Sequence, residues 1–175
     1  LGLITGDRLS VPPTDLGSLN VWEISRLLWE LNVNKVMVKR KDVITTDPDA
    51  TIEQSAKKMI DHRIGCLPVI EENDVVVGIL SEVDLLAELA TLLGGGREGV
   101  RVTVRVPDRV GEFSKVTSSI SSKGWGIYSS GSVPAPKKEG YWDLVVKVRN
   151  VAIEDLEEVL SKDPDHEIVD IRRSS

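Results

Sequence analysis

The sequence has little of what metal centres and nucleic-acid surfaces are built from. Its 175 residues include one cysteine, two histidines, four Trp, two Tyr and one Phe. The lone Cys66 excludes an internal disulfide. His62 and His166 have no partner at a metal-binding spacing, so no metal site is predicted. A net charge of −6 and scattered aromatic residues argue against a nucleic-acid partner.

Long apolar runs are also absent from the sequence. No stretch approaches the roughly 18 residues that a bilayer-spanning helix needs, so no membrane insertion is expected. The N-terminus lacks the basic and then apolar layout of a signal peptide. With a single cysteine in the chain, these features favour a reducing, cytoplasmic location.

A glycine run gives the clearest boundary. Gly94-Gly95-Gly96 follows an apolar helical pattern over 84–93 and precedes a strand-like run over 100–106. Because glycine ends helices and loosens the chain, residues 94–98 are predicted to form a linker. A chain of this length suffices for two small domains, one on each side of the linker.

The sequence before the glycine run predicts short helices and short strands. A helix is expected over 18–31, with Trp22 and Trp29 as packing residues. A strand over 43–46 precedes a capping box at Thr51–Gln54. The helix that begins there is expected to bury Ile52, Ala56, Met59 and Ile60 and to end before Gly65. Strands 67–70 and 75–80 and the helix over 84–93 follow.

The C-terminal side predicts a split βαβ arrangement with both helices on one face of an antiparallel sheet. The expected strands cover 100–106, 126–133, 142–148 and 167–171, and the expected helices cover 110–123 and 153–161. Core stripes are predicted at Phe113, Val116 and Ile120 in the first helix and at Ile153, Leu156, Val159 and Leu160 in the second.

An internal repeat suggests a family. Gly2–Leu9 echoes Gly78–Leu85, and the shared pattern resembles the closing motif of CBS domains. Earlier CBS landmarks lie in order at Asp47–Ile52, Arg63–Val69 and Val77–Gly78. By this resemblance, 37–93 is a second CBS domain, and 1–36 is the remnant of a first copy plus a connecting helix. Most of the first copy is therefore expected to exist in the natural protein or to be replaced by a partner chain.

The C-terminal residues 99–175 resemble an ACT domain, because Val106–Gly111 occupies the place of that family's first loop. The expected fold class is thus α+β: a Bateman-type CBS region of order β-α-β-β-α, followed by a ferredoxin-like βαββαβ domain. CBS followed by ACT resembles the acetoin-utilisation B-type regulatory proteins.

The CBS resemblance implies an adenine-nucleotide site for AMP, ADP or ATP, with S-adenosylmethionine less favoured. Ser81 would contact phosphate and Asp84 would hold the ribose hydroxyls, although the pair also suits a simple helix cap. In the first copy Thr5 matches the hydroxyl position, and Arg8, standing where the family has Asp, would turn toward phosphate. The adenine wall would comprise Ile44, Thr45, Ile64, Gly65, Cys66, Leu67 and Pro68.

The ACT resemblance implies an amino-acid site at the loop 108–111. Asp108 would hold an ammonium group, and Gly111 would let a carboxylate approach the backbone. The alternative is that Asp108 caps the following helix and that Gly111 fits close packing.

No motif predicts catalysis. The serines over 114–132 lack a nucleophile-elbow context, and the carboxylates over 154–158 fit the solvated face of a helix. The sequence therefore predicts a non-catalytic, nucleotide-binding regulator that forms a homodimer or a higher even homo-oligomer. A dimerisation scaffold without a small ligand and an amino-acid sensor are the alternatives.

Overall fold

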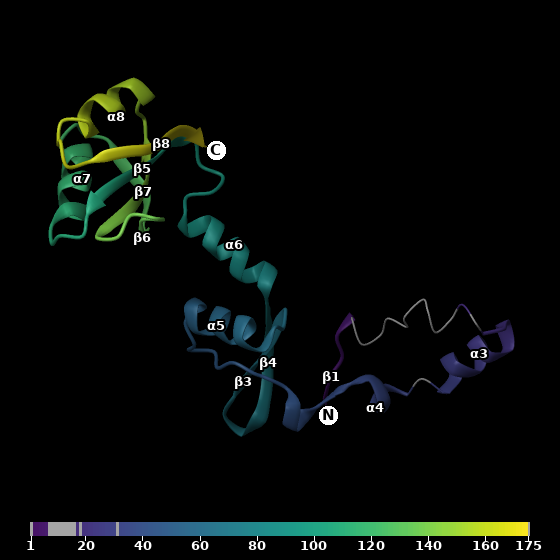
Figure 1. Ribbon diagram of the computed structural model, residues 1–175. Coiled ribbons are helices and arrows are strands. Elements are labelled where there is room, and N and C mark those ends of the chain that lie inside the picture. The colour runs from purple at the N-terminus through teal and green to yellow at the C-terminus, as the bar shows by residue number, and fades with distance from the viewer. Residues whose placement is uncertain (1, 7–16, 18, 31, 175) are drawn as a thin grey trace. The chain divides into compact units, whose positions relative to one another are not determined.

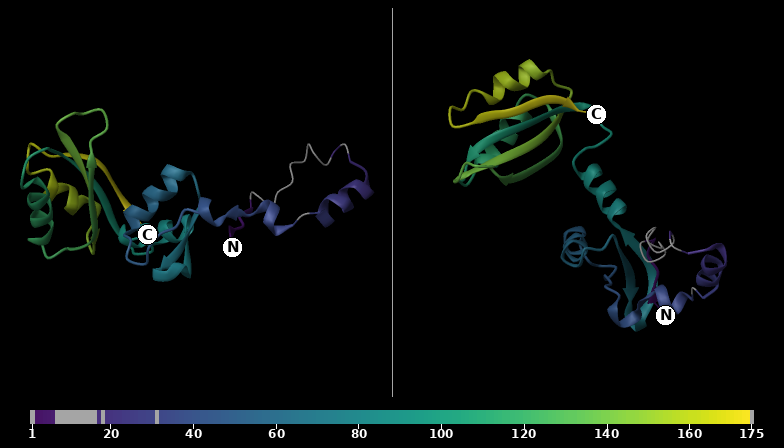
Figure 2. Two further views of the ribbon diagram at one scale, coloured as in Figure 1. Left: turned by 90° about the horizontal axis from the view of Figure 1, so that it is seen from below. Right: turned by 45° about the vertical axis from the view of Figure 1, so that its right-hand side comes forward.

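The computed structural model describes residues 2–6, 17, 19–30 and 32–174 (Figures 1 and 2). The chain is mixed α and β and divides into two compact units, Leu1–Glu82 and Val83–Ser175. The predicted boundaries after residues 36, 93 and 98 stay predictions.

The N-terminal unit begins with short elements that meet as a two-stranded pair. Strand β1 (Gly2–Leu3) pairs antiparallel with β2 (Val38–Lys39), with Gly2 opposite Lys39. Any Cβ on Gly2 would collide with the carbonyl oxygen of Val38, so only glycine allows this approach. Helices α3 (Val21–Glu30) and α4 (Val33–Val36) lie between the two strands in sequence.

The predicted first helix is confirmed as α3, but its two tryptophans do not pack. The side-chain oxygen of Asn20 accepts hydrogen bonds from the amides of Trp22 and Glu23 and so caps the helix. Trp22 and Trp29 are 86% and 91% exposed, so the packing role predicted for them is wrong for the described residues.

The strand predicted over 43–46 is reduced to one residue. A 3-10 helix (Arg40–Asp42) precedes it, and only Thr46 forms a bridge, parallel to Val69. The amide of Thr46 donates to the carbonyl of Pro68 at 3.0 Å. A turn in which the amide of Ala50 bonds Asp47 follows at once, which leaves no room for a longer strand.

Helix α5 (Ile52–His62) begins at the predicted capping box, in which Thr51 and Gln54 bond each other's backbone. It ends on Arg63, whose left-handed φ of 53° replaces the expected glycine stop at Gly65. Its buried residues are Ser55 and Met59. The predicted burial of Ile52 and Ile60 is wrong, because both side chains are exposed.

The next two strands form an antiparallel hairpin as predicted. Strand β3 (Cys66–Glu71) pairs with β4 (Val75–Ser81) across the turn Glu72–Asp74. Leu67 is fully buried, whereas most of β4 is exposed. Helix α6 (Glu82–Leu92) follows directly.

The C-terminal unit has the predicted βαββαβ order after α6. Its sheet is antiparallel throughout, with strand order β6-β7-β5-β8, which is compatible with a ferredoxin-like ACT domain. The elements are β5 (Gly99–Pro107), α7 (Glu112–Ser121), β6 (Gly126–Pro134), β7 (Tyr141–Arg149), α8 (Ile153–Leu160) and β8 (Glu167–Ser174).

Alternation along the strands builds the core of this unit. Every second residue of β5 and β7 is buried and faces α7 and α8, which cover one face of the sheet (Figures 1 and 2). The predicted stripes are confirmed at Val116, Ile120, Leu156 and Leu160. Phe113 is 44% exposed, so its predicted core position is wrong.

The other face of the sheet carries charged side chains that are largely buried. Arg105 and Asp143 pair across strands, with Nε to Oδ1 at 2.8 Å and Nη2 to Oδ2 at 3.0 Å. Lys147 is 2% exposed, and its Nζ donates to the carbonyl of Gly94 at 2.8 Å. Since Gly94 follows α6, this buried lysine holds the C-terminal end of α6 within the C-terminal unit.

Candidate ligand site

Several predicted nucleotide-binding residues meet at the start of β3. Ser81, the last residue of β4, lies directly opposite Cys66 in the hairpin. The amide of Glu82 donates to the carbonyl of Gly65 at 2.9 Å. Residues separated by 15 positions in the sequence are therefore fixed side by side by the strand register.

The segment around Thr45, which belongs to the predicted adenine-binding residues, lies against strand β3 of the same hairpin. Thr46 is tied to β3 through the carbonyl of Pro68, as described above, and its own carbonyl accepts from the amide of Ile70 at 2.9 Å. Lys58 Nζ donates to the carbonyl of Thr45 at 3.0 Å, which fixes this segment against α5. The structure therefore brings Thr45 close to Pro68.

The side chains of the predicted residues differ in how much surface they offer. Those of Ile44, Ile64 and Cys66 are half-buried, and Gly65 is exposed. Leu67 is fully buried, so only its backbone can face a ligand. The binding role of this set stays a prediction.

The residues predicted to contact phosphate and ribose lie in different parts of the chain, and one of them is outside the described residues. Ser81 is half-buried and belongs to the N-terminal unit. Asp84 is exposed in the first turn of α6, and the residues of α6 from Val83 onward belong to the C-terminal unit. Thr5 is half-buried, and Arg8 lies outside the described residues.

A hollow of about 350 Å³ lies in the N-terminal unit beside this site. Thr45 and Pro68 line it, as do apolar residues of β4 and the charged pair Arg40 and Asp74. This charged pair could not be predicted from the sequence. Arg40 lies in a basic run and Asp74 in a polar turn more than 30 residues later, and no sequence pattern indicates that the two side chains meet.

The predicted amino-acid loop lies at the N-terminus of α7. Gly111 is the N-cap residue with φ 95°, a conformation that favours glycine, and no side chain caps the helix there. Asp108 is exposed, and its amide donates to the carbonyl of Gly140 at 2.8 Å. The alternative in which the Asp108 side chain caps α7 is therefore not what the structure has.

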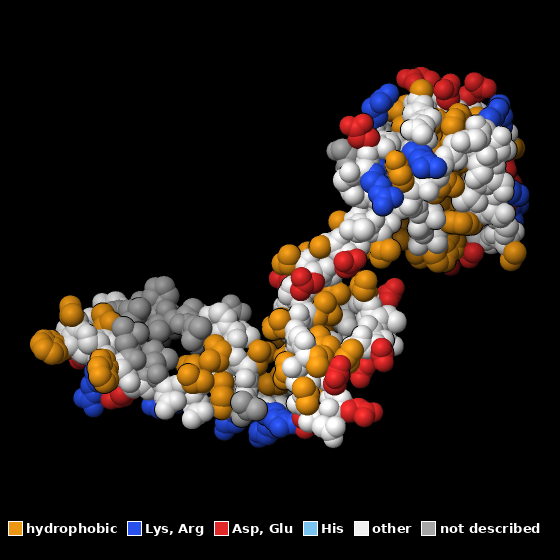
Figure 3. Space-filling view, turned by 180° about the vertical axis from the view of Figure 1, so that it is seen from behind, with side chains coloured by type: hydrophobic (Ala, Val, Ile, Leu, Met, Phe, Trp, Pro, Cys, Tyr) orange, Lys and Arg blue, Asp and Glu red, His pale blue; other side chains and the backbone are white. Residues whose placement is uncertain are grey.

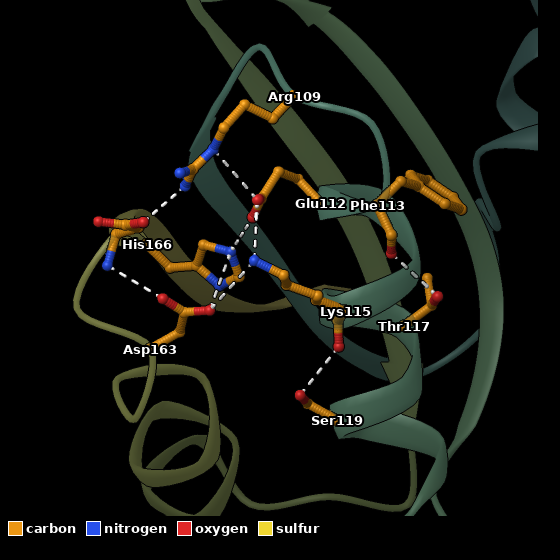
Figure 4. Close-up of polar contacts among 9 residues, drawn as sticks. Arg109, Glu112, Phe113, Lys115, Thr117, Ser119, Asp163 and His166 are labelled. Atoms are coloured by element: carbon orange, nitrogen blue, oxygen red, sulfur yellow. Dashed lines mark hydrogen bonds and ion pairs between the residues drawn. The ribbon is translucent and has the colours of Figure 1, made fainter.

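An ion-pair network lies next to this loop (Figure 4). Glu112, 3% exposed, has its Oε2 2.8 Å from His166 Nε2 and its Oε1 2.9 Å from Lys115 Nζ. Arg109 contacts both Glu112, at 3.4 Å, and Asp165, at 2.5 Å. The network joins the first turn of α7 to the segment between α8 and β8.

The network shifts the ionisation of its members. The hydrogen bond from His166, and then that from Lys115, lowers the pKa of Glu112 below its usual 4.5. Glu112, Asp163 and His166 place metal-type ligand atoms within 4.8 Å of one another. However, Lys115 and Arg109 already neutralise Glu112, so the geometry favours an ion-pair network over a metal centre.

Comparison with known families agrees with the N-terminal landmarks. The family model described as CBS domain matches residues 33–91. These residues form a CBS domain. CBS domains are regulatory rather than catalytic modules and commonly bind adenosine ligands. The family match covers about a third of the chain and does not extend to the βαββαβ region.

Curated relatives share only part of their length with the chain. A chloroplastic CBS domain-containing protein of Arabidopsis thaliana is 29% identical over 104 residues, which are 59% of this chain and 44% of that protein. A homoserine O-acetyltransferase of Methanococcus vannielii is 36% identical over 70 residues, 38% of this chain but 14% of the enzyme. So short an overlap does not carry the enzyme's activity to this chain.

The similar solved structures include a formyltetrahydrofolate deformylase from Pseudomonas syringae pv. tomato. It covers 53% of this chain and 33% of its own, with 17% identity and a TM-score of 0.37. A likeness this low supports no inference. Among the described residues, no helix is long and apolar enough to cross a membrane.

Proposed function

We propose that the chain is a non-catalytic regulatory protein whose CBS domain binds AMP, ADP or ATP in preference to S-adenosylmethionine. The observation that carries the proposal is the convergence of Thr45, Cys66, Pro68 and Ser81 around β3. Backbone groups at strand ends suit the edge of a base. A hydroxyl at the start of α6, followed by Asp84 in its first turn, suits phosphate and ribose.

The proposal includes transmission toward the C-terminal unit, an ACT domain that contributes to a homodimer or higher even oligomer. The bond from Lys147 to Gly94 supports this part, because it holds the end of α6 in that unit. A ligand shifts such an arrangement only by its differential affinity for the two states. The cytoplasmic location and the likeness to acetoin-utilisation regulators belong to the same proposal.

Isothermal titration of the full chain with AMP, ADP, ATP and S-adenosylmethionine tests the nucleotide site. Asp84→Ala and Ser81→Ala should each weaken nucleotide binding about tenfold, the effect of losing one hydrogen bond to a charged group. Asp155→Ala is a matched control, since Asp155 is likewise the third residue of an exposed helix start. If none of these compounds binds the unaltered chain, a dimerisation scaffold becomes the better account.

An amino-acid sensor is a second candidate, favoured by the exposed Asp108 beside the glycine N-cap of α7. A panel of amino acids in the same titration tests it. Binding that is lost in Asp108→Ala and kept in Asp155→Ala would support this site, and the absence of any amino-acid binding would reject it.

A further inference from the structure

A second hollow, of about 450 Å³, lies at the end of the C-terminal sheet where β5 begins and where β7 and β8 end. Pockets of this size hold small molecules. Its lining includes Glu98, Val100, Asn150, Val151, Arg173 and Ser174, and none of these residues belongs to the proposed nucleotide site. The loop 108–111 follows the other end of β5, about 26 Å away along the strand.

The hollow combines an apolar floor with a charged rim. Val100 is 1% exposed, and Val151 packs against the core of the unit. Arg173 lies directly opposite Val100 in the pairing of β5 with β8, so the two side chains lie on the same face of the sheet. Glu98 immediately precedes β5, and both it and Arg173 are exposed. A ligand in this hollow therefore meets aliphatic side chains below and both signs of charge above.

The two charges of the rim do not neutralise each other. In the described part of the chain, neither Glu98 nor Arg173 takes part in an ion pair or a side-chain hydrogen bond. The next arginine differs, because Arg172 Nε donates to Asp170 Oδ2 at 2.8 Å. The guanidinium of Arg173 is thus available for a carboxylate, and the carboxylate of Glu98 is available for a hydrogen-bond donor.

Asn150 adds a neutral polar group in a conformation that is uncommon for residues other than glycine. Its φ of 56° lies in the left-handed region, directly after the last residue of β7. Such conformations concentrate at ligand sites, and an amide can both donate and accept hydrogen bonds. The lining therefore offers three different polar groups to a single small molecule.

We propose that this hollow binds a small aliphatic carboxylic acid that carries a hydrogen-bond donor, a hydroxyl or an ammonium group, on the carbon beside the carboxylate. Arg173 pairs with the carboxylate, and Glu98 accepts from the neighbouring donor. Val100 and Val151 contact the aliphatic chain. This site is additional to the proposed nucleotide site and is distinct from the loop 108–111.

Isothermal titration of the full chain with L-valine, α-hydroxyisovalerate and isovalerate tests the ligand class. The three acids share a branched chain and a carboxylate, and the neighbouring carbon carries an ammonium group, a hydroxyl or neither. Valine or α-hydroxyisovalerate should bind about tenfold more tightly than isovalerate, because only these two can donate to Glu98. The tighter of the two identifies the donor.

Variants of the rim test the residues. Arg173→Gln should weaken the tighter acid about tenfold, and Arg173→Lys should recover part of the loss. Glu98→Gln should abolish the preference over isovalerate. Arg172→Gln is the matched control, since it removes the same charge one residue away in β8 and should change binding less than twofold. Asp108→Ala should leave binding unchanged.

Three results would overturn the proposal. They are a failure of all three acids to bind, equal affinities for the three, and binding that is lost in Asp108→Ala but kept in Arg173→Gln, which would place the ligand at the loop 108–111. Each of them leaves the nucleotide site untouched, because that site is tested with separate ligands and with variants at Ser81 and Asp84.

Discussion

The two units bury their apolar side chains in different ways. In the C-terminal unit, eleven buried hydrophobic residues form one cluster between the sheet and its two helices. Among the described residues of the N-terminal unit, the buried hydrophobic residues are Met59 and Leu67. The C-terminal unit thus has one continuous core, whereas the described part of the N-terminal unit buries few apolar side chains.

The apolar residues of the N-terminal unit lie instead at its surface (Figure 3). Val75, Val76, Val77 and Ile79 on β4 are 47–63% exposed. Neighbouring residues of a strand point to opposite faces, so both faces of β4 are apolar and open in the described structure. This comparison teaches that strand register can bring the candidate ligand-binding residues Cys66 and Ser81 together without a large core around them.

Matched leucine truncations give the largest expected effect. Leu156 and Leu67 are both fully buried, one in each unit. Leu156→Ala should lower the unfolding free energy of its unit by about 4 kcal/mol, because the packed neighbours cannot close the cavity. Leu67→Ala should lower that of its unit by about 2 kcal/mol, because the less packed surroundings can collapse into the cavity. Hydrogen exchange of the β5 and β3 amides measures the two separately. Equal costs would remove the contrast between the units.

Removal of the buried lysine tests whether α6 stays with the C-terminal unit. Lys147→Met keeps the apolar stem but leaves the buried carbonyl of Gly94 without its donor, at an expected cost of about 1 to 2 kcal/mol. Amides of Leu93 and Gly95, which bond back to α6, should exchange faster. Lys123→Met, on an exposed position, serves as the control. Unchanged exchange in Lys147→Met would show that the bond does not hold the helix end.

The smallest expected effect is a pH dependence confined to the C-terminal unit. The folded-state pKa of Glu112 is lowered, so its contribution is present above the usual value of 4.5 and is lost as pH falls through the folded pKa. The unfolding free energy of this unit should therefore decline below about pH 4.5, and less steeply in Glu112→Gln. Urea unfolding between pH 3 and 7 measures this, with exposed Glu157→Gln as the control. Identical slopes in Glu112→Gln and the unaltered chain would contradict it.

Prediction succeeded where one local signal was sufficient. The strand-like runs over 100–106 and 142–148 located β5 and β7. Helix α5 begins where the predicted capping box of Thr51 and Gln54 placed it. It failed where burial depends on distant partners, as for Ile60 and Phe113, which have helical spacing but remain exposed. A periodic stripe says which face is apolar and not whether another element covers it.

In the candidate site, too, some residues could be predicted from the sequence and some contacts could not. The glycine, hydroxyl and carboxylate landmarks from Gly65 to Asp84 can be found in the sequence, because the repeat and the CBS pattern mark them. The pair of Arg40 with Asp74, and the network around Glu112, join residues far apart in the chain. No local pattern records such pairings, because they follow from the strand register and the paths of the turns.

The sequence by itself determined the order of elements, the capping box and the CBS landmarks of this protein, since each depends on residues within a few positions of one another. Only the tertiary structure decided that Ser81 lies opposite Cys66, that Arg40 meets Asp74 and that Lys147 holds Gly94. Those contacts depend on strand pairing and on turns with left-handed residues, which set distances that sequence spacing leaves open.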